Sequence, residues 1–183
     1  MKLMAFDMEF EQPSQEIIQI GVCVGDTQIP GTMLATKVWY VLPRSGQPLS
    51  EFIIGLTGIT QETMDREGIP LEQAYAELCA MVKEEQVMLH PVVWGSGDCR
   101  ALRAQLGLDN ERFIFGRREV DAKTLYVSYC IANGLSYRAG LNKALIKLGL
   151  SFIGKKHDAE DDAWNTWRIY TELLSKLNEY NNV

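Results

Sequence analysis

Apolar runs separated by short turns occupy the first forty residues of the chain. The runs cover residues 3–10, 16–24 and 36–42, and Gly and Pro lie in the turn between the second and third runs. Apolar runs of this length bounded by turn residues are typical of β-strands. Because parallel strands need much longer connections, the short turns predict antiparallel neighbours. We therefore expect the chain to begin with three strands.

The spacing of apolar residues changes to that of helices after residue 50. In residues 70–85, apolar side chains recur every three or four positions, which places them on one face of a helix. Two short strands are expected, at the start of residues 92–98 and near 118–122. Further helices are predicted near residues 99–106, 123–132, 140–148 and 158–178. Hairpin strands followed by strands that alternate with helices predict an α/β fold, in which helices cover both faces of a mixed sheet.

The last predicted helix has an apolar stripe that orients its acidic residues. The stripe consists of Ala163, Trp167, Tyr170, Leu174 and Leu177. On a helical wheel, Asp162 lies on the flank of this stripe, whereas Asp161 lies nearly opposite it. Glu160 also falls near the stripe, in the first turn. We expect Asp162 to point toward the rest of the protein, with Glu160 as an alternative.

Length and composition indicate one domain without a membrane span. At 183 residues, of which 46% are hydrophobic, the chain suits a single domain over residues 1–183 and is too short for two ordinary ones. No apolar run approaches the length needed to cross a bilayer. Asp7 and Glu9 interrupt the position where a signal peptide would need its apolar segment. We therefore expect a cytoplasmic protein with no membrane partner.

Charge and cysteine content exclude two other classes of protein. With a net charge of -6, the chain lacks the general basic surface of a duplex-binding protein. Any contact with nucleic acid must therefore be local or assisted by metal ions. The four cysteines form no C-x-x-C pair. This spacing favours reduced thiols over a zinc site or a disulfide framework.

The segment "FDMEF" carries two acids on the first predicted strand. Asp7 and Glu9 are two residues apart, so they project from the same face roughly 6 to 7 Å apart. Such a pair is stable when it is protonated, paired with a base, or bound to a hard cation such as magnesium. No Lys or Arg lies in the apolar stretch of this strand. The alternative is an edge strand whose acidic face is in solvent.

Two further segments place acids at predicted helix starts. Asp98 follows a strand in "VVWGSGDCRAL", where it is either a functional residue of a sheet loop or an ordinary helix cap. In "KKHDAEDDA", Asp158 can cap the last helix, and acids in a first turn suit the helix dipole. Capping does not account for His157, which lies five residues before Asp162.

Several other residues have both a structural and a functional interpretation. Thr57 and Thr60 either cap local structure or hold a ribose or phosphate. Phe10 belongs to the core or stacks on a base. Lys155 and Lys156 either form a solvated surface or contact phosphate.

Four segments together resemble the DEDDh exonucleases, the DnaQ-like branch of the RNase H-like fold. These segments are "FDMEFEQPSQEIIQIG", "PLSEFIIGLTGIT", "WGSGDCRALRAQL" and "HDAEDDA", in the order and spacing of that family. The passage from "PLSEF" into "LTGIT" and the W-G-x-x-D form are most similar to ERI-type and KapD-like exoribonucleases. The resemblance implies an RNase H-like fold with a mixed five-stranded sheet flanked by helices.

The resemblance also implies roles for individual residues. It makes His157 the general base, and it makes four acids the metal ligands: Asp7, Glu9, Asp98 and Asp162. Substrate contacts are implied for Met8, Phe10, Leu56, Thr57 and Lys156. This sequence departs from many relatives after the first motif, where Phe10 and Glu11 replace small residues near the 3′ terminal nucleotide.

The implied activity is that of a metal-dependent 3′-to-5′ exonuclease. The resemblance implies two Mg²⁺ ions, which Mn²⁺ can replace, and release of nucleoside 5′-monophosphates from single-stranded 3′ ends of RNA. One alternative is a DNA proofreading or repair exonuclease. Another is a catalytically silent module that binds nucleic acid or a protein, which the intact set of mutually repelling acids disfavours. The sequence is compatible with a monomer or a homodimer.

Overall fold

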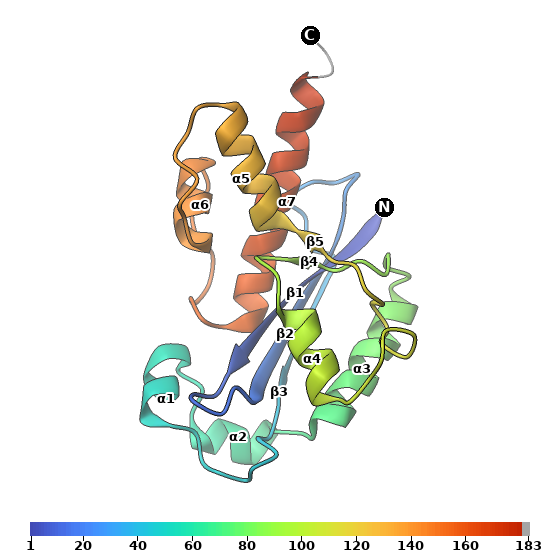
Figure 1. The fold of residues 1–183 in the computed structure, drawn as a ribbon, viewed down its shortest axis with the longest axis vertical. Helices are drawn as coiled ribbons and strands as arrows, with labels where there is room; N and C mark the ends of the chain where they lie inside the picture. The colour runs from blue at the N-terminus through green and yellow to red at the C-terminus, as the bar shows by residue number, and fades with distance from the viewer. Residues whose placement is uncertain (181–183) are drawn as a thin grey trace.

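A five-stranded mixed sheet lies at the centre of the computed structural model, which describes residues 1–180 (Figure 1). Its strands are β1 (Lys2–Phe10), β2 (Ile17–Asp26), β3 (Ala35–Tyr40), β4 (Val92–Val93) and β5 (Val120–Asp121). Their order is β3-β2-β1-β4-β5. Strands β1 and β3 each pair antiparallel with β2, whereas β4 and β5 are parallel to β1. The predicted mixed sheet is confirmed. Because β1 is the central strand, the edge-strand interpretation of Asp7 and Glu9 is wrong.

Helices cover both faces of the sheet. They are α1 (Glu51–Thr57), α2 (Gln61–Glu67), α3 (Leu71–Glu84), α4 (Asp98–Gln105), α5 (Ala122–Ala132), α6 (Leu141–Lys147) and α7 (Ala159–Tyr180). Figure 1 shows α3 and α4 on one side of the sheet and α5, α6 and α7 on the other. Helices α1 and α2 are the two that the sequence did not predict, because each has only seven residues and spans too few turns for a periodic stripe. None of the helices within residues 1–180 is both long and apolar enough to span a membrane.

The side chains of β1 alternate between two separate cores. Leu3 and Ala5 pack on the α7 side, together with Trp167. The opposite side packs on α3 and α4 and receives Met4, Phe6 and Met8. Because the strand alternates, Asp7 and Glu9 continue the α7 side beyond its apolar part. The strand therefore directs both carboxylates toward the start of α7.

Two glycines of β2 let α7 lie directly on the sheet. A Cβ atom at Gly21 would come within 2.0 Å of the carbonyl carbon of Ala159, and one at Gly25 within 2.1 Å of the Trp167 ring. Any larger residue would push the helix away. Gly21 pairs with Asp7 in the β1–β2 register, so the close approach brings the first turn of α7 beside the acidic end of β1.

The buried stripe of α7 differs from the predicted one in its second half. Ala163 and Trp167 are buried as predicted, but Leu177 is 43% exposed, and Leu173 is fully buried where Leu174 was expected. The reason is that this half of the helix packs against α5 and α6 instead of the sheet. The change keeps Asp162 on the inner side, eleven positions before Leu173 on the same face.

All four cysteines are free thiols. Cys23 and Cys130 are buried, and Cys79 and Cys99 are partly buried. This confirms the expectation from their spacing that they form no disulfide framework.

Candidate active site

Three chain segments bring four carboxylates together at the carboxyl end of β1. Asp7 and Glu9 come from the strand, Asp98 from the first residue of α4, and Asp162 from the first turn of α7. All four are partly buried. The negative charges of Asp98, Asp162 and Glu9 all raise the pKa of Asp7. The four acids that the sequence singled out therefore form one acidic cluster.

Burial and mutual repulsion disfavour the charged forms of these acids. Burial is the main cause at each position. It raises the pKa of Asp7 well above its ordinary value of 3.8, with further increases from Asp98 and Asp162. The pKa of Glu9 rises to about 7, that of Asp98 to about 7 and that of Asp162 to about 6. A divalent cation would compensate this repulsion, and carboxylate oxygens are the ligands that hard cations prefer.

The side chain of Asp98 does not cap α4. Gly97 occupies the N-cap position with φ of 143°, a conformation that favours glycine, and no side chain forms a cap hydrogen bond there. The capping interpretation of Asp98 is therefore wrong. The charge of its carboxylate instead raises the pKa of Asp7 and of Glu9.

His157 lies at the edge of the cluster in a strained conformation. One ligand atom from each of Glu9, His157 and Asp162 lies within 4.8 Å of the others. The backbone of His157 is left-handed, with φ of 60°, which is uncommon for a residue other than glycine. Its main-chain NH donates to Oδ2 of Asp162 at 3.3 Å. This arrangement holds the exposed imidazole beside the carboxylates, where it can accept a proton from a water molecule or bind a cation.

Gln19 is a positioning residue that the sequence interpretation missed. This fully buried side chain donates to Oδ2 of Asp158 at 3.1 Å and accepts from the main-chain NH of Ala159 at 2.9 Å. It also pairs with Glu9 in the β1–β2 register. Gln19 thus fixes the start of α7 relative to the acidic strand. The available signal was a single amide residue inside the apolar run "IIQIGVCV".

The remaining acids around the start of α7 have structural roles. Asp158 caps the helix, because its Oδ1 accepts from the main-chain NH groups of Glu160 at 3.2 Å and Asp161 at 3.3 Å. Asp161 accepts from the NH of Lys155 at 2.7 Å, which braces the preceding loop. Glu160 is not among the charges that act on Asp7 or Glu9. Asp158 does raise the pKa of both, but its carboxylate is engaged by Gln19 and by the helix start, which leaves Asp162 as the acid of this group that joins the cluster.

Two of the expected substrate contacts have buried side chains. Met8 is 5% exposed and packs in the core. Thr57 is 1% exposed, and its hydroxyl donates to the Ile53 carbonyl at 2.9 Å and accepts from the Ile59 NH at 3.1 Å. Neither side chain is free for a ligand, so only their main chains can contact one. The capping interpretation of Thr60 is confirmed, since it caps α2.

The other expected substrate contacts lie at or near the surface. Lys156 lines a pocket of about 310 Å³ together with His157 and Asp162. Leu56 is 38% exposed, and Phe10 is partly buried against the core. Lys156 is thus the expected contact that shares a pocket with residues of the proposed site.

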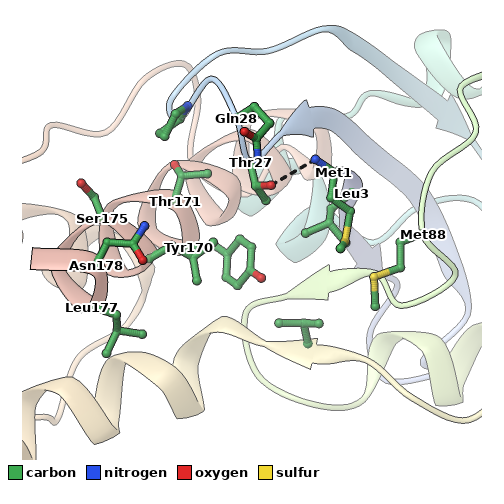
Figure 2. Close-up of a pocket in the computed structure, with 13 residues that line it drawn as sticks. Met1, Leu3, Thr27, Gln28, Met88, Tyr170, Thr171, Ser175, Leu177 and Asn178 are labelled. Carbon is green, nitrogen blue, oxygen red and sulfur yellow. Dashed lines mark hydrogen bonds between the residues drawn. The ribbon is translucent and has the colours of Figure 1, made fainter. Parts of the chain in front are cut away.

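A larger pocket, of about 590 Å³, lies at the opposite end of β1 (Figure 2). Its walls include Met1, Leu3, Met88 and Tyr170, and none of the described residues that line it is acidic. Figure 2 shows the amino terminus donating to the Thr27 hydroxyl at its rim. This pocket is therefore separate from the acidic cluster, although it is larger than the pocket beside His157.

The acidic cluster predicts an unusual pH dependence of stability. Without metal, the free energy of unfolding should fall as the pH rises from the ordinary acid values of 3.8 and 4.5 to about 7. The unfolded chain loses its protons first in this window, so the folded state binds more protons and a rise in pH favours unfolding. Thermal melts in chelator across this range measure the effect.

The control for this prediction is the same pH series with magnesium. The cation should raise the melting temperature more at the upper end of the window, where the carboxylates are charged. A metal-free stability that rises across the window would contradict the proposed burial of these acids.

A family model described as an exonuclease, RNase_T, matches residues 4–170. Human ERI1 exoribonuclease 2 is 27% identical over 179 residues, which cover 88% of this chain and 26% of that protein. The probable 3′-5′ exonuclease KapD of Bacillus subtilis (strain 168) is 25% identical over 187 residues, which cover 97% of this chain and 86% of KapD. The chain thus spans only about a quarter of the human relative but most of the bacterial one.

The fold is similar to that of a solved nuclease. The nuclease domain of 3′hExo, a DEDDh family member bound to rAMP, superposes with a TM-score of 0.81 over 96% of this chain and 92% of that one. The two sequences are 24% identical. This similarity confirms the predicted RNase H-like fold.

Proposed function

The chain belongs to the RNase_T exonuclease family, and from this premise we propose that it is a metal-dependent 3′-to-5′ exonuclease acting on single-stranded RNA. The observation that carries the proposal is the convergence of four carboxylates from β1, α4 and α7, with His157, just before α7, beside two of them. A protein that only bound a partner would have no use for acids that repel each other. The names of the relatives, an exoribonuclease and a 3′-5′ exonuclease, support the polarity and the RNA substrate.

The proposed ligands of the metal ions are Asp7, Glu9, Asp98 and Asp162. Their donor atoms suit hard cations, and burial followed by the charges of neighbouring acids raises the pKa of each one, which a bound cation would offset. When bound, two Mg²⁺ or Mn²⁺ ions would activate the attacking water and stabilise the leaving 3′ oxygen. With its charge neutralised, the cluster would no longer repel the scissile phosphate.

His157 is the proposed general base. Histidine is the side chain that most often serves as a general base. The strained loop and the hydrogen bond to Asp162 hold it beside the cluster. Attack by the water would release a nucleoside 5′-monophosphate and leave a new 3′ hydroxyl on the shortened strand.

The proposal includes a cytoplasmic location and a single catalytic domain. Four free cysteines suit a reducing compartment. The family model spans most of residues 1–183, which supports one domain over that range.

Single-stranded RNA carrying a 5′ label should be shortened one nucleotide at a time from its 3′ end, and duplex RNA should resist. The net charge of -6 leaves little general attraction for a duplex, so an accessible 3′ end must be threaded to the cluster. Products resolved by length test this directly, with a matched DNA strand as the comparison.

A circular RNA serves as the control for end dependence. Cuts in the circle would remove the exonuclease assignment. Faster digestion of DNA by about tenfold, which corresponds to about 1.4 kcal/mol, would favour a DNA proofreading or repair enzyme over the RNA-directed one.

A further inference from the structure

A pocket rich in arginine lies beside the acidic cluster and has no part in the mechanism described above. Its volume is about 260 Å³, and it lies between the start of α4 and the segment of residues 115–119. Four arginines line it: Arg100, Arg103, Arg117 and Arg118. The whole chain holds nine arginines and carries a net charge of -6, so this is a strong local concentration of positive charge.

Three of these arginines are exposed and unpaired. Within residues 1–180, the arginines in ion pairs are Arg44, Arg66 and Arg112, all away from this pocket. Arg100, Arg117 and Arg118 have no carboxylate partner in that range, so their guanidinium groups are available to a ligand.

Arg103 has a different, structural role. It donates to the side chain of Asn110 and to the Gly116 carbonyl, and it lies 6.0 Å from the ring centroid of Phe113. These contacts hold the residue 115–119 segment against α4. The acid that lines the pocket is Glu119. It is hydrogen-bonded to the Cys99 thiol, and its charge raises the pKa of Asp98, so its interactions are with the side of the pocket that faces the acidic cluster.

The pocket adjoins Asp98, which does not itself line it. Gly97 and Cys99 line it, and these residues directly flank Asp98 in the chain. A strand whose 3′ end reaches Asp98 would therefore have its next nucleotides within reach of the exposed arginines. The pocket offers no free aromatic face, because Phe115 is only 2% exposed. Its polar chemistry suits a phosphate, since guanidinium groups bind phosphate oxygens in a forked geometry.

We propose that this arginine pocket binds phosphate groups of the substrate strand on the 5′ side of the nucleotide being removed. The inference rests on the proposed exonuclease function and adds a binding site to it. Because the contacts are to phosphate, binding should not depend on base sequence.

The double variant Arg117→Gln/Arg118→Gln tests the pocket. KM for a single-stranded oligonucleotide should rise roughly tenfold, because the variant cannot form charge-assisted hydrogen bonds to phosphate. The slope of log binding constant against log salt should fall in magnitude by about 0.7 for each phosphate that the variant no longer neutralises. Hydrolysis of a p-nitrophenyl ester of a nucleoside 5′-monophosphate should stay unchanged, since this small substrate does not extend to the pocket.

The matched control is Arg66→Gln/Arg112→Gln, which makes the same change of net charge at exposed arginines elsewhere. It should leave KM near the wild-type value. An unchanged KM and salt slope in the pocket variant would overturn the proposal, as would an equal loss on the ester, which would assign the arginines to the support of Asp98. If the wild type cleaves neither substrate, the exonuclease function fails instead, and oligonucleotide binding followed by fluorescence anisotropy still tests the pocket.

Discussion

Chelation of divalent cations is expected to abolish exonuclease activity, and added magnesium or manganese should restore it. Burial raises the pKa of Glu9 and Asp98 to about 7, and Asp7 is raised well above its ordinary value. Near neutral pH, the metal-free cluster therefore stays partly protonated, and no cation is present to neutralise the scissile phosphate or to activate water. Rates on labelled RNA in chelator, followed by metal titration, measure this effect.

A control must separate loss of metal from loss of fold. Thermal melts in the same buffers show whether the metal-free protein is still folded when it is inactive. Full cleavage by a purified, metal-stripped sample would contradict the role assigned to the four carboxylates.

The second large effect is expected at the start of α7, where neighbouring residues should differ sharply. Asp162→Asn and His157→Ala should nearly abolish turnover, while Asp161→Asn should keep much of it. The amide at position 162 keeps the size of the side chain but removes the charge that would hold a cation. Loss of a general base typically costs about 10² to 10⁴ in rate, so His157→Ala should fold normally and turn over slowly.

Asp161→Asn is the matched control, because it makes the same chemical change one position away. Its side chain accepts from the Lys155 NH, and an asparagine oxygen can still accept that bond. Rates and thermal melts of the three variants decide the assignment. If Asp161→Asn were folded but as inactive as Asp162→Asn, the choice between the two acids would be wrong. Wild-type rates in His157→Ala would make the histidine structural.

Regular geometry oriented three acids of the cluster, whereas Asp98 and the shared role of all four were implied by the resemblance to the DEDDh exonucleases. The alternation of β1 puts Asp7 and Glu9 on one face, and the wheel of α7 separates Asp162 from Asp161. These two rules depend only on local periodicity, which the sequence shows directly. The structure agrees on both points, since the charges of Glu9 and Asp162 act on Asp7 while Asp161 braces a loop.

Features that depend on contacts between distant segments were not predictable in the same way. Gln19 forms a hydrogen bond with Asp158, which lies 139 positions away, and the residues around Gln19 do not indicate this partner. The stripe of α7 was misjudged at Leu174 and Leu177 because the helix leaves the sheet and packs on α5 and α6 there. The arginine pocket likewise joins residues from α4 to a later segment, residues 115–119.

The most direct test of the central claim is anomalous scattering from manganese in crystals grown with the ion and a nucleoside 5′-monophosphate. Two manganese peaks about 3.5 to 4 Å apart are expected among Asp7, Glu9, Asp98 and Asp162, with the phosphate on the same ions. Crystals of an active preparation that show no manganese at these carboxylates would contradict the central claim.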